Sequence, residues 1–310
     1  MPLIDKIQQW IADPPPDHLL EITETSLAAG SPRTPAQHKR EVLVERGLTA
    51  SPSTPNLLKP HLYREALPRL LPMNGAKRRA TALVIPDYAV RMALLDFQEF
   101  PSGEPERTAL IRFRLRKSVP FHIDEAQLSY SIQRTEPKRF DVLAVVIARP
   151  ILEEYETLFT DAGYRVGMVM PSCLATLRLC ESAAMGLTLL VKAAGSHVSA
   201  VLFEAGRVHL IRCLDLTGND VADTEESVAM TQPEGDLIMP LLQQTLAYAE
   251  DQLGTAVARL LLCGFGPETE ILGSLAEKEF GVGYAPVRSK FGAASQENAG
   301  LLGLLERYAA

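Results

Sequence analysis

Hydrophobic and polar residues follow two periods along this chain, one typical of strands and one typical of helices. Alternating or short apolar runs bounded by turn residues predict strands at 19–31 (a hairpin), 41–50, 80–97 with a turn at Pro86-Asp87, 127–133, 140–148, 164–170, 187–193, 198–204, 207–216 and 257–266. Helical spacing predicts helices at 56–71, 106–117, 150–162, 172–185, 236–253, 267–280 and 301–308. Three successive strands followed by helices occur twice, which indicates an α/β fold with internal duplication.

The N-terminal residues show a separate pattern. Ile4, Ile7, Trp10 and Ile11 fall at helical spacing before a run of three prolines, which predicts a short amphipathic helix over 2–12. Docking of this helix onto the protein itself is favoured over docking onto a membrane surface, because a membrane-bound helix has more basic residues on its polar face.

Composition narrows the classes of function. The chain has 310 residues, of which 46% are hydrophobic, and a net charge of −7. The length predicts two lobes, each with its own core, and the acidic balance disfavours nucleic acid as a partner. No window reaches the roughly 20 apolar residues of a membrane span. The four cysteines and six histidines lack the spacing of a metal site, so we expect buried free thiols and no bound metal.

A series of longer motifs resembles a known family. The segment RFRLRKSVPFHIDE at 112–125, the strand and helix that begin at Asp141, and the double hairpin TLLVKAAGSHVSAVLFEAGRVHLIRCLDL at 188–216 follow in the order and spacing of PilM. PilM is the actin-like cytoplasmic protein of type IV pilus assembly and is related in fold to FtsA. The resemblance extends from Leu19 to the C-terminus and implies a two-lobed, actin-like fold, which is a duplicated ribonuclease H-like fold.

This resemblance also implies a division of the chain. The amphipathic helix and its linker would occupy 1–16. Lobe 1 would cover 17–186 and consist of subdomain 1A with a subdomain 1C inserted at about 79–140. Lobe 2 would cover 187–294, with subdomain 2A complete and subdomain 2B reduced to a short segment at 216–236. The last residues, 295–310, would form a helix that returns to lobe 1.

The resemblance places a degenerate nucleotide site between the two hairpins. Actin-like ATPases begin each hairpin with Asp-x-Gly, because glycine lets backbone N–H groups approach phosphates and aspartate positions magnesium. Here the two elements read Glu21-Ile22-Thr23 and Lys192-Ala193-Ala194. A threonine cannot adopt positive φ cheaply, and an ammonium repels a metal ion although it can pair with a phosphate. The candidate nucleotide-binding residues are Glu21, Thr25, Ser26, Lys192, Gly195, Ser196, Gly264 and Gly266.

No other catalytic set is predicted. Ser196 and His197 are adjacent, and adjacent residues of a strand point to opposite faces, so we expect their side chains not to form a hydrogen-bonded dyad. We therefore expect no catalytic residues, no magnesium binding, and weak nucleotide binding if there is any.

Three functional hypotheses follow from the resemblance. In the first, the chain is a cytoplasmic scaffold, recruited to the inner membrane because it binds the cytoplasmic N-terminal peptide of a PilN-like partner; Arg116, Pro120 and Phe121 are the candidate contacts. In the second, it is an actin-like ATPase or nucleotide switch. In the third, it is the cytoplasmic domain of a GspL-like type II secretion protein, which would continue into a transmembrane helix.

Overall fold

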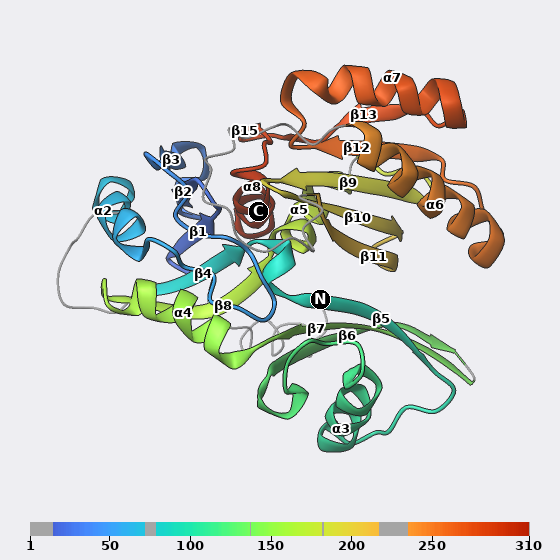
Figure 1. The fold of residues 1–310 in the computed structure, drawn as a ribbon, viewed down its shortest axis with the longest axis horizontal. Coiled ribbons are helices and arrows are strands. Elements are labelled where there is room, and N and C mark those ends of the chain that lie inside the picture. Colours follow the sequence, from blue (N-terminus) through green and yellow to red (C-terminus); the bar gives the residue numbers. More distant parts are fainter. Residues whose placement is uncertain (1–14, 72–78, 137, 182, 217–234, 310) are drawn as a thin grey trace, which may run out of the picture.

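The computed structural model describes residues 15–71, 79–136, 138–181, 183–216 and 235–309. The predicted helix at 2–12 and most of the predicted reduced subdomain at 216–236 lie outside these residues. Within them, two five-stranded sheets, a smaller three-stranded sheet and a two-stranded ribbon are arranged with their helices as in Figure 1.

The first large sheet has the strand order β3-β2-β1-β4-β8. Strands β1 and β2 form an antiparallel hairpin, β3 continues it, and β4 and β8 run parallel to β1. Their bounds are β1 His18–Ile22, β2 Ser26–Gly30, β3 Lys39–Val42, β4 Arg79–Ile85 and β8 Tyr164–Pro171. All residues of β1 and β2 are buried, because helices cover both faces of this sheet.

The second large sheet repeats this topology, in the order β11-β10-β9-β12-β13. The bounds are β9 Thr188–Ala194, β10 His197–Glu204, β11 Arg207–Asp215, β12 Arg259–Cys263 and β13 Tyr284–Pro286. Strands β9, β10 and β11 are antiparallel, and β12 and β13 are parallel to β9. The identical order of the two sheets confirms the predicted duplication.

Two helices fill the space between the sheets. Helices α5 (Ser172–Cys180) and α8 (Ala299–Tyr308) pack against each other, and their apolar residues share one core with β1, β4, β9 and β12. Helices α2 (Pro60–Leu70) and α4 (Arg149–Thr160) cover the outer face of the first sheet. Helices α6 (Gly235–Leu253) and α7 (Thr269–Phe280) cover the outer face of the second.

The three-stranded sheet is formed by a segment inserted between β4 and β8 of the first large sheet. It has the order β5-β7-β6, with β5 Arg91–Phe97, β6 Gln127–Glu136 and β7 Arg139–Ile147. Helix α3 (Glu104–Leu115) packs on one face through Ile111 and Leu115. The predicted subdomain boundary at 79–140 is wrong at both ends, because β4 pairs with β1 and β8 in the first large sheet and β7 continues to Ile147.

Some element boundaries also differ from the prediction. The strand predicted at 41–50 is β3, which begins at Lys39 and ends at Val42. The following residues leave the sheet, and Gly47 lies against the Tyr63 ring, where a Cβ would be 2.6 Å from a ring carbon. The helix predicted at 56–71 is α2, which begins at Pro60, where the first helical residue needs no N–H. The short ribbon consists of β14 (Arg288–Ser289) and β15 (Gly292–Ala293).

Candidate functional site

The turns of the two hairpins face each other across the lobes. The β1–β2 turn is closed within itself: the Thr23 N–H donates to the Ser26 carbonyl at 3.0 Å, and the Ser26 N–H donates to Thr23 Oγ1 at 3.1 Å. Thr23 is not among the described residues with positive φ. Its hydroxyl therefore stabilises an ordinary turn, whereas the glycine of an Asp-x-Gly element would leave the N–H groups open to a phosphate.

Glu24 lies between the two turns. Its carboxylate accepts a hydrogen bond from Ser196 Oγ at 3.2 Å and pairs with Arg46 at 3.4 Å. It also lies so close to Gly195 that a Cβ at Gly195 would be 2.7 Å from Glu24 Oε2. Gly195 has φ of 61°, so both its conformation and its contact require glycine. An internal carboxylate thus joins the two lobes at the hairpin turns.

Burial raises the pKa of Glu24 above its ordinary value of 4.5, although Arg46 and Ser196 counteract part of this effect. A carboxyl with a raised pKa stabilises the folded state below its unfolded pKa and loses this contribution as the pH rises through its folded pKa. As the pH rises above about 4.5, the free energy of unfolding should therefore fall less for Glu24→Gln than for the wild type. Urea unfolding across this range measures the difference.

The control for this prediction is Glu45→Gln. Glu45 is an exposed glutamate that pairs with Lys59, and it immediately precedes Arg46 in the sequence. The wild type and this control are expected to give parallel curves. If the curve of unfolding free energy against pH for Glu24→Gln is also parallel to that of the wild type, burial does not raise the pKa of Glu24.

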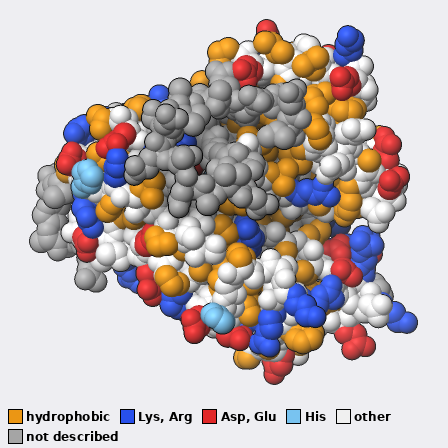
Figure 2. All heavy atoms as spheres, in the orientation of Figure 1, with side chains coloured by type: hydrophobic (Ala, Val, Ile, Leu, Met, Phe, Trp, Pro, Cys, Tyr) orange, Lys and Arg blue, Asp and Glu red, His pale blue; other side chains and the backbone are white. Residues whose placement is uncertain are grey.

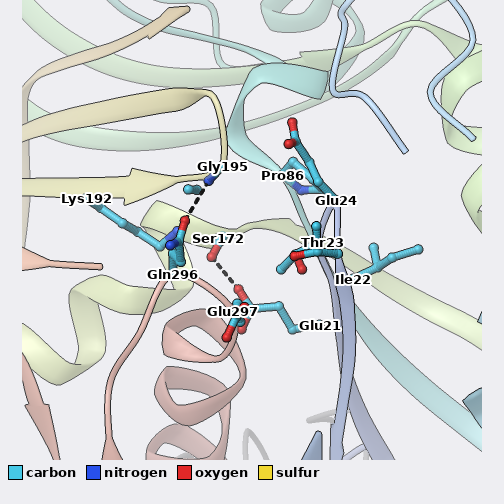
Figure 3. A pocket seen from close by; sticks show the side chains of 12 residues that line it. Glu21, Ile22, Thr23, Glu24, Pro86, Ser172, Lys192, Gly195, Gln296 and Glu297 are labelled. Carbon is cyan, nitrogen blue, oxygen red and sulfur yellow. Dashed lines mark hydrogen bonds between the residues drawn. The ribbon is translucent and has the colours of Figure 1, made fainter. Parts of the chain in front are cut away.

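The backbone N–H of the second turn is also occupied. Gly195 N–H donates to Gln296 Oε1 at 2.9 Å, and Figure 3 shows this side chain reaching the turn from the segment before α8. In a phosphate-binding hairpin this N–H would face the ligand. Sequence reasoning did not identify Gln296 or Glu24, because neither belongs to a motif and Gln296 is distant in the chain.

Lys192 is fully buried beneath the second hairpin. Among the described residues its Nζ has no hydrogen-bond partner. Burial by itself would lower the pKa of this ammonium, but the carboxylates of Asp87 and Glu21 outweigh burial and raise the pKa above 10.5. Lys192 is therefore charged at neutral pH and balances these two carboxylates through space.

The two carboxylates are held by both lobes and by two helix N-termini. Glu21 accepts from Ser172 Oγ at 2.5 Å and from the Leu301 N–H at 2.7 Å. Asp87 accepts from the Cys173 N–H at 2.7 Å and from Ser199 Oγ, in the other lobe, at 2.8 Å. Burial raises the pKa of Glu21 even though Lys192 is nearby. Figure 3 shows Glu21 and Ser172, which come from β1 and α5, on one side of the cavity and Lys192, which comes from β9, on the other.

This charge arrangement does not fit magnesium. A divalent cation prefers several oxygen ligands with room for its waters, whereas here an ammonium already lies beside the carboxylates that would bind it. In the described part of the chain no group of three or more His, Cys, Asp or Glu side chains could hold a metal ion.

The cavity between the hairpins is also small. Glu21, Thr25, Lys192 and Gly195 line a space of about 30 Å³. A site needs about 10–15 Å³ of such space to hold one water, so this space has room for about two or three waters. Glu24, Gln296 and Lys192 are among the residues that line this cavity between the hairpin turns.

The remaining candidates lie around this cavity without lining it. Ser26 is buried in the first turn, and Gly264 and Gly266 follow β12 with φ of 87° and 52°. A Cβ at Gly264 would be 2.5 Å from the Ala193 carbonyl oxygen, so this glycine permits close backbone packing. Phe265 between them is buried in the core of the second lobe and points away from the cavity.

The expectation for Ser196 and His197 is wrong. Their side chains share a hydrogen bond, with 3.2 Å between Ser196 Oγ and His197 Nδ1. The reason is that Ser196 lies in the turn before β10, where the alternation of a strand does not apply. Both side chains face the interlobe contact with Glu24 and neither lines the cavity, so the pair is part of the contact between the lobes.

The predicted partner-binding residues follow α3. Arg116 and Pro120 are exposed, and Arg116 pairs with Asp124 at 3.1 Å. Phe121 is half-buried between the core of the first lobe and the core under α3. Figure 2 shows Lys and Arg side chains gathered on this part of the molecule. Their neighbour Phe113 is 71% exposed, which gives α3 an apolar as well as a basic surface.

Comparison with known proteins supports the architecture. No protein-family model matches the sequence, and no curated protein sequence does. The chain superposes on a protein of a "PilM-PilN type IV pilus biogenesis complex" with a TM-score of 0.72 and 17% identity, over 94% of this chain and 98% of that one. The fold is actin-like.

Two further structures agree with this fold. One is a Bacteroides thetaiotaomicron protein with an actin-like ATPase fold and unknown function, with a TM-score of 0.52, 15% identity and coverage of 93% and 95%. The other is the cytoplasmic domain of EpsL, an inner-membrane component of the type II secretion system of Vibrio cholerae, with a TM-score of 0.50, 11% identity and coverage of 94% and 93%. Among the described residues, no helix is long and apolar enough to cross a membrane.

Proposed function

We propose that this protein is a cytoplasmic scaffold of type IV pilus assembly that binds the N-terminal peptide of a PilN-like inner-membrane protein without hydrolysing ATP. The observation that carries this proposal is the self-occupied cleft. Glu24 and Gln296 take up the hydrogen-bonding groups of the hairpin turns, and Lys192 neutralises the carboxylates beside them. The lobes are thus joined without a ligand.

A scaffold of this kind needs a partner surface outside the cleft. The fold match to the PilM of a PilM–PilN complex supports a PilN-like partner. On this chain the candidate surface is formed by Arg116, Pro120 and Phe121, at the junction of the inserted subdomain and the first lobe. Extended peptides bind such junctions through apolar pockets and exposed backbone groups. Recruitment to the inner membrane would follow from this binding.

Isothermal titration calorimetry with the cytoplasmic N-terminal peptide of a PilN-like protein from the same genome tests the proposal. We expect a Kd in the micromolar range, and about tenfold weaker binding by Arg116→Glu, which corresponds to about 1.4 kcal/mol. Arg69→Glu is a matched control, because Arg69 is also 61% exposed and also paired with a carboxylate. The absence of binding at high micromolar peptide would exclude this function.

The nucleotide-switch alternative makes an opposite prediction in a thermal-shift assay. A ligand that binds only the folded state raises the melting temperature. With the cleft occupied by its own side chains, we expect millimolar Mg-ATP to leave the melting temperature unchanged. A clear increase would support the switch instead. The match to the EpsL cytoplasmic domain supports a secretion role, which peptides from the corresponding secretion partner would test in the same calorimetric assay.

A further inference from the structure

Strand β6 forms an open edge of the inserted three-stranded sheet. The sheet has the order β5-β7-β6, so β5 and β6 are its two edge strands (Figure 1). Strand β5 packs against β11 of the second lobe, whereas β6 pairs with β7 and has no second neighbour among the described strands. An edge strand presents unpaired backbone N–H and C=O groups with which another chain can pair.

The first part of β6 lacks the features that usually protect a sheet edge. Short length, charged side chains and proline discourage the pairing of an edge with another chain. Strand β3 has four residues, KREV, of which three are charged, and β13 has three residues and ends at Pro286. Residues 127–133 of β6, QLSYSIQ, contain no charge and no proline. We call this stretch the β6 edge.

The β6 edge has one polar and one apolar face. Ser129 and Ser131 project to the same face, because side chains alternate along a strand, and both are exposed. Leu128, Tyr130 and Ile132 project to the opposite face. There Leu128 and Tyr130 pack partly buried against the core under α3, and Ile132 is 39% exposed. Both faces are therefore accessible at the outer side of the strand.

The second lobe contacts β6 beyond this accessible part. The Val208 N–H donates to Gln133 Oε1 at 2.9 Å, and the ladder between β6 and β7 becomes irregular between Ile132 and Arg134. Irregularities of this kind disturb the pairing of an edge. The regular part of the β6 edge is therefore 127–132.

The β6 edge is complementary to itself in the antiparallel direction. Tyr130 is its midpoint, so a two-fold axis at Tyr130 places every residue of the edge opposite another residue of the edge. On the apolar face, Leu128 lies opposite Ile132 of the other copy and Tyr130 lies opposite Tyr130. On the polar face, Ser129 lies opposite Ser131. Cross-strand pairs of aromatic, aliphatic and hydroxyl side chains with their own kind stabilise a sheet.

The charges around this axis are also compatible with a second copy. The Tyr130 hydroxyl donates to Glu104 at 2.5 Å, and Arg107 interacts with the same hydroxyl. A carboxylate and a guanidinium thus accompany each tyrosine at the axis. At the ends of the edge, Arg134 comes opposite Ala126 of the other copy, next to its Glu125, so opposite charges meet there.

We propose that the β6 edge pairs with the β6 edge of a second copy of this chain, antiparallel about a two-fold axis at Tyr130. The two three-stranded sheets then form one continuous sheet, and the same surface serves on both copies, as in other two-fold dimers. One pair of strands buries less area than a permanent interface, so we expect the dimer to be reversible. The pairing does not involve Arg116, Pro120 or Phe121 and does not depend on the proposed PilN-like partner.

Sedimentation velocity of the full chain from low to high micromolar concentration tests the proposal, with a reversible dimer as the expected result. A variant with both Ser129→Lys and Ser131→Lys places two pairs of lysines directly opposite each other, which should weaken dimerisation about tenfold or more. A variant with Ser53→Lys and Ser274→Lys adds the same charge at two exposed serines elsewhere and should dimerise as the wild type does.

A charge-reversed variant makes the test specific to direct pairing. Ser129→Glu with Ser131→Glu should also weaken dimerisation, because glutamates then lie opposite each other. Mixing this variant with the lysine variant should restore a dimer, since each lysine now faces a glutamate. In the wild type, hydrogen exchange of the amides at 128–132 should become slower as the protein concentration rises, because strand pairing protects backbone N–H groups.

Three results would overturn the proposal. They are a wild type that stays monomeric at high micromolar concentration, a dimer that persists in the lysine variant, and a mixture of lysine and glutamate variants that stays monomeric although both melt as the wild type does. If the variants fold poorly, amide exchange at 128–132 that does not depend on wild-type concentration overturns it equally. Calorimetry with the PilN-like peptide should give the same Kd for the lysine variant and the wild type, so the two proposals can fail separately.

Discussion

Lys192→Met is expected to lower the free energy of unfolding by about 3–5 kcal/mol, the usual cost of removing one partner from a buried charge arrangement. Methionine has nearly the length of lysine, so the change removes the charge without leaving a large cavity. The carboxylates of Glu21 and Asp87, which are 1% exposed, would then be buried without a cation. Chemical denaturation at pH 7 measures the loss, and an unchanged m-value would show that the unfolding transition is otherwise the same.

Two further measurements identify the cause of this loss. Adding Glu21→Gln to Lys192→Met should recover part of the stability, since one unpaired carboxylate is removed, and a double-mutant cycle gives the coupling. The loss should also shrink as the pH falls, because protonated carboxyls need no cation. In the wild type the pKa of Lys192 in the folded state lies above 10.5. Its contribution to the free energy of unfolding is therefore complete below pH 10.5 and is lost only as the pH rises through the folded-state pKa. A Lys192→Met protein as stable as the wild type would show that the charges are not coupled.

The architecture could be predicted from the sequence because it depends on periodicity. Strands such as 187–193 and 198–204 are mostly apolar and bounded by turn residues, and a sheet covered on both faces favours this pattern. The repeat of three strands indicated the duplication for the same reason. Boundaries were predicted less well where tertiary contacts decide them. The run 80–97 was predicted as strand with a turn at Pro86-Asp87, but the pattern does not show that the two parts, β4 and β5, belong to different sheets.

Only those features of the candidate site that depend on residues close together in the sequence could be predicted. The hairpin turns and Lys192 follow from motif positions, but the contacts that occupy the cleft do not. Glu24 meets Ser196 across 172 residues of sequence, and Gln296 meets Gly195 across 101. No local pattern specifies such pairs. The same limitation explains the error at Ser196 and His197, where the position of the turn relative to the strand decides which side chains can meet.

The occupied cleft and the packing beneath it suggest a rigid relation between the lobes. Actin-like proteins that respond to nucleotide change the angle between their lobes when the ligand changes. Here Glu24, Asp87 and Lys192 join the lobes through internal charges and hydrogen bonds. Directly below them, α5 and α8 cross at close range in the core that the lobes share. At this crossing, Gly303 of α8 lies directly against the backbone of Ala175 in α5.

Gly303→Ala is expected to destabilise the protein by about 3 kcal/mol, the upper part of the range for overpacking a filled core. A Cβ at Gly303 of α8 would be 2.0 Å from the carbonyl oxygen of Ala175 and 2.7 Å from its carbonyl carbon. These are backbone atoms of α5 and cannot rotate away, so the two helices must separate. The gain in helix propensity from glycine to alanine, about 1 kcal/mol, is too small to offset this. Thermal and urea unfolding measure the change.

Two variants make the Gly303 prediction specific. Ala175→Gly should not rescue Gly303→Ala, because the collision is with the carbonyl group, which every residue at position 175 retains. Gly167→Ala in β8 is the control: nothing lies within 4 Å of a Cβ there, so a change of less than about 0.5 kcal/mol is expected for such an open site. If Gly303→Ala is tolerated as well as Gly167→Ala, the two helices can move apart without cost. The lobes would then be less rigidly joined than the contacts at Lys192 and Glu24 imply, and a nucleotide-driven change of lobe angle would regain support.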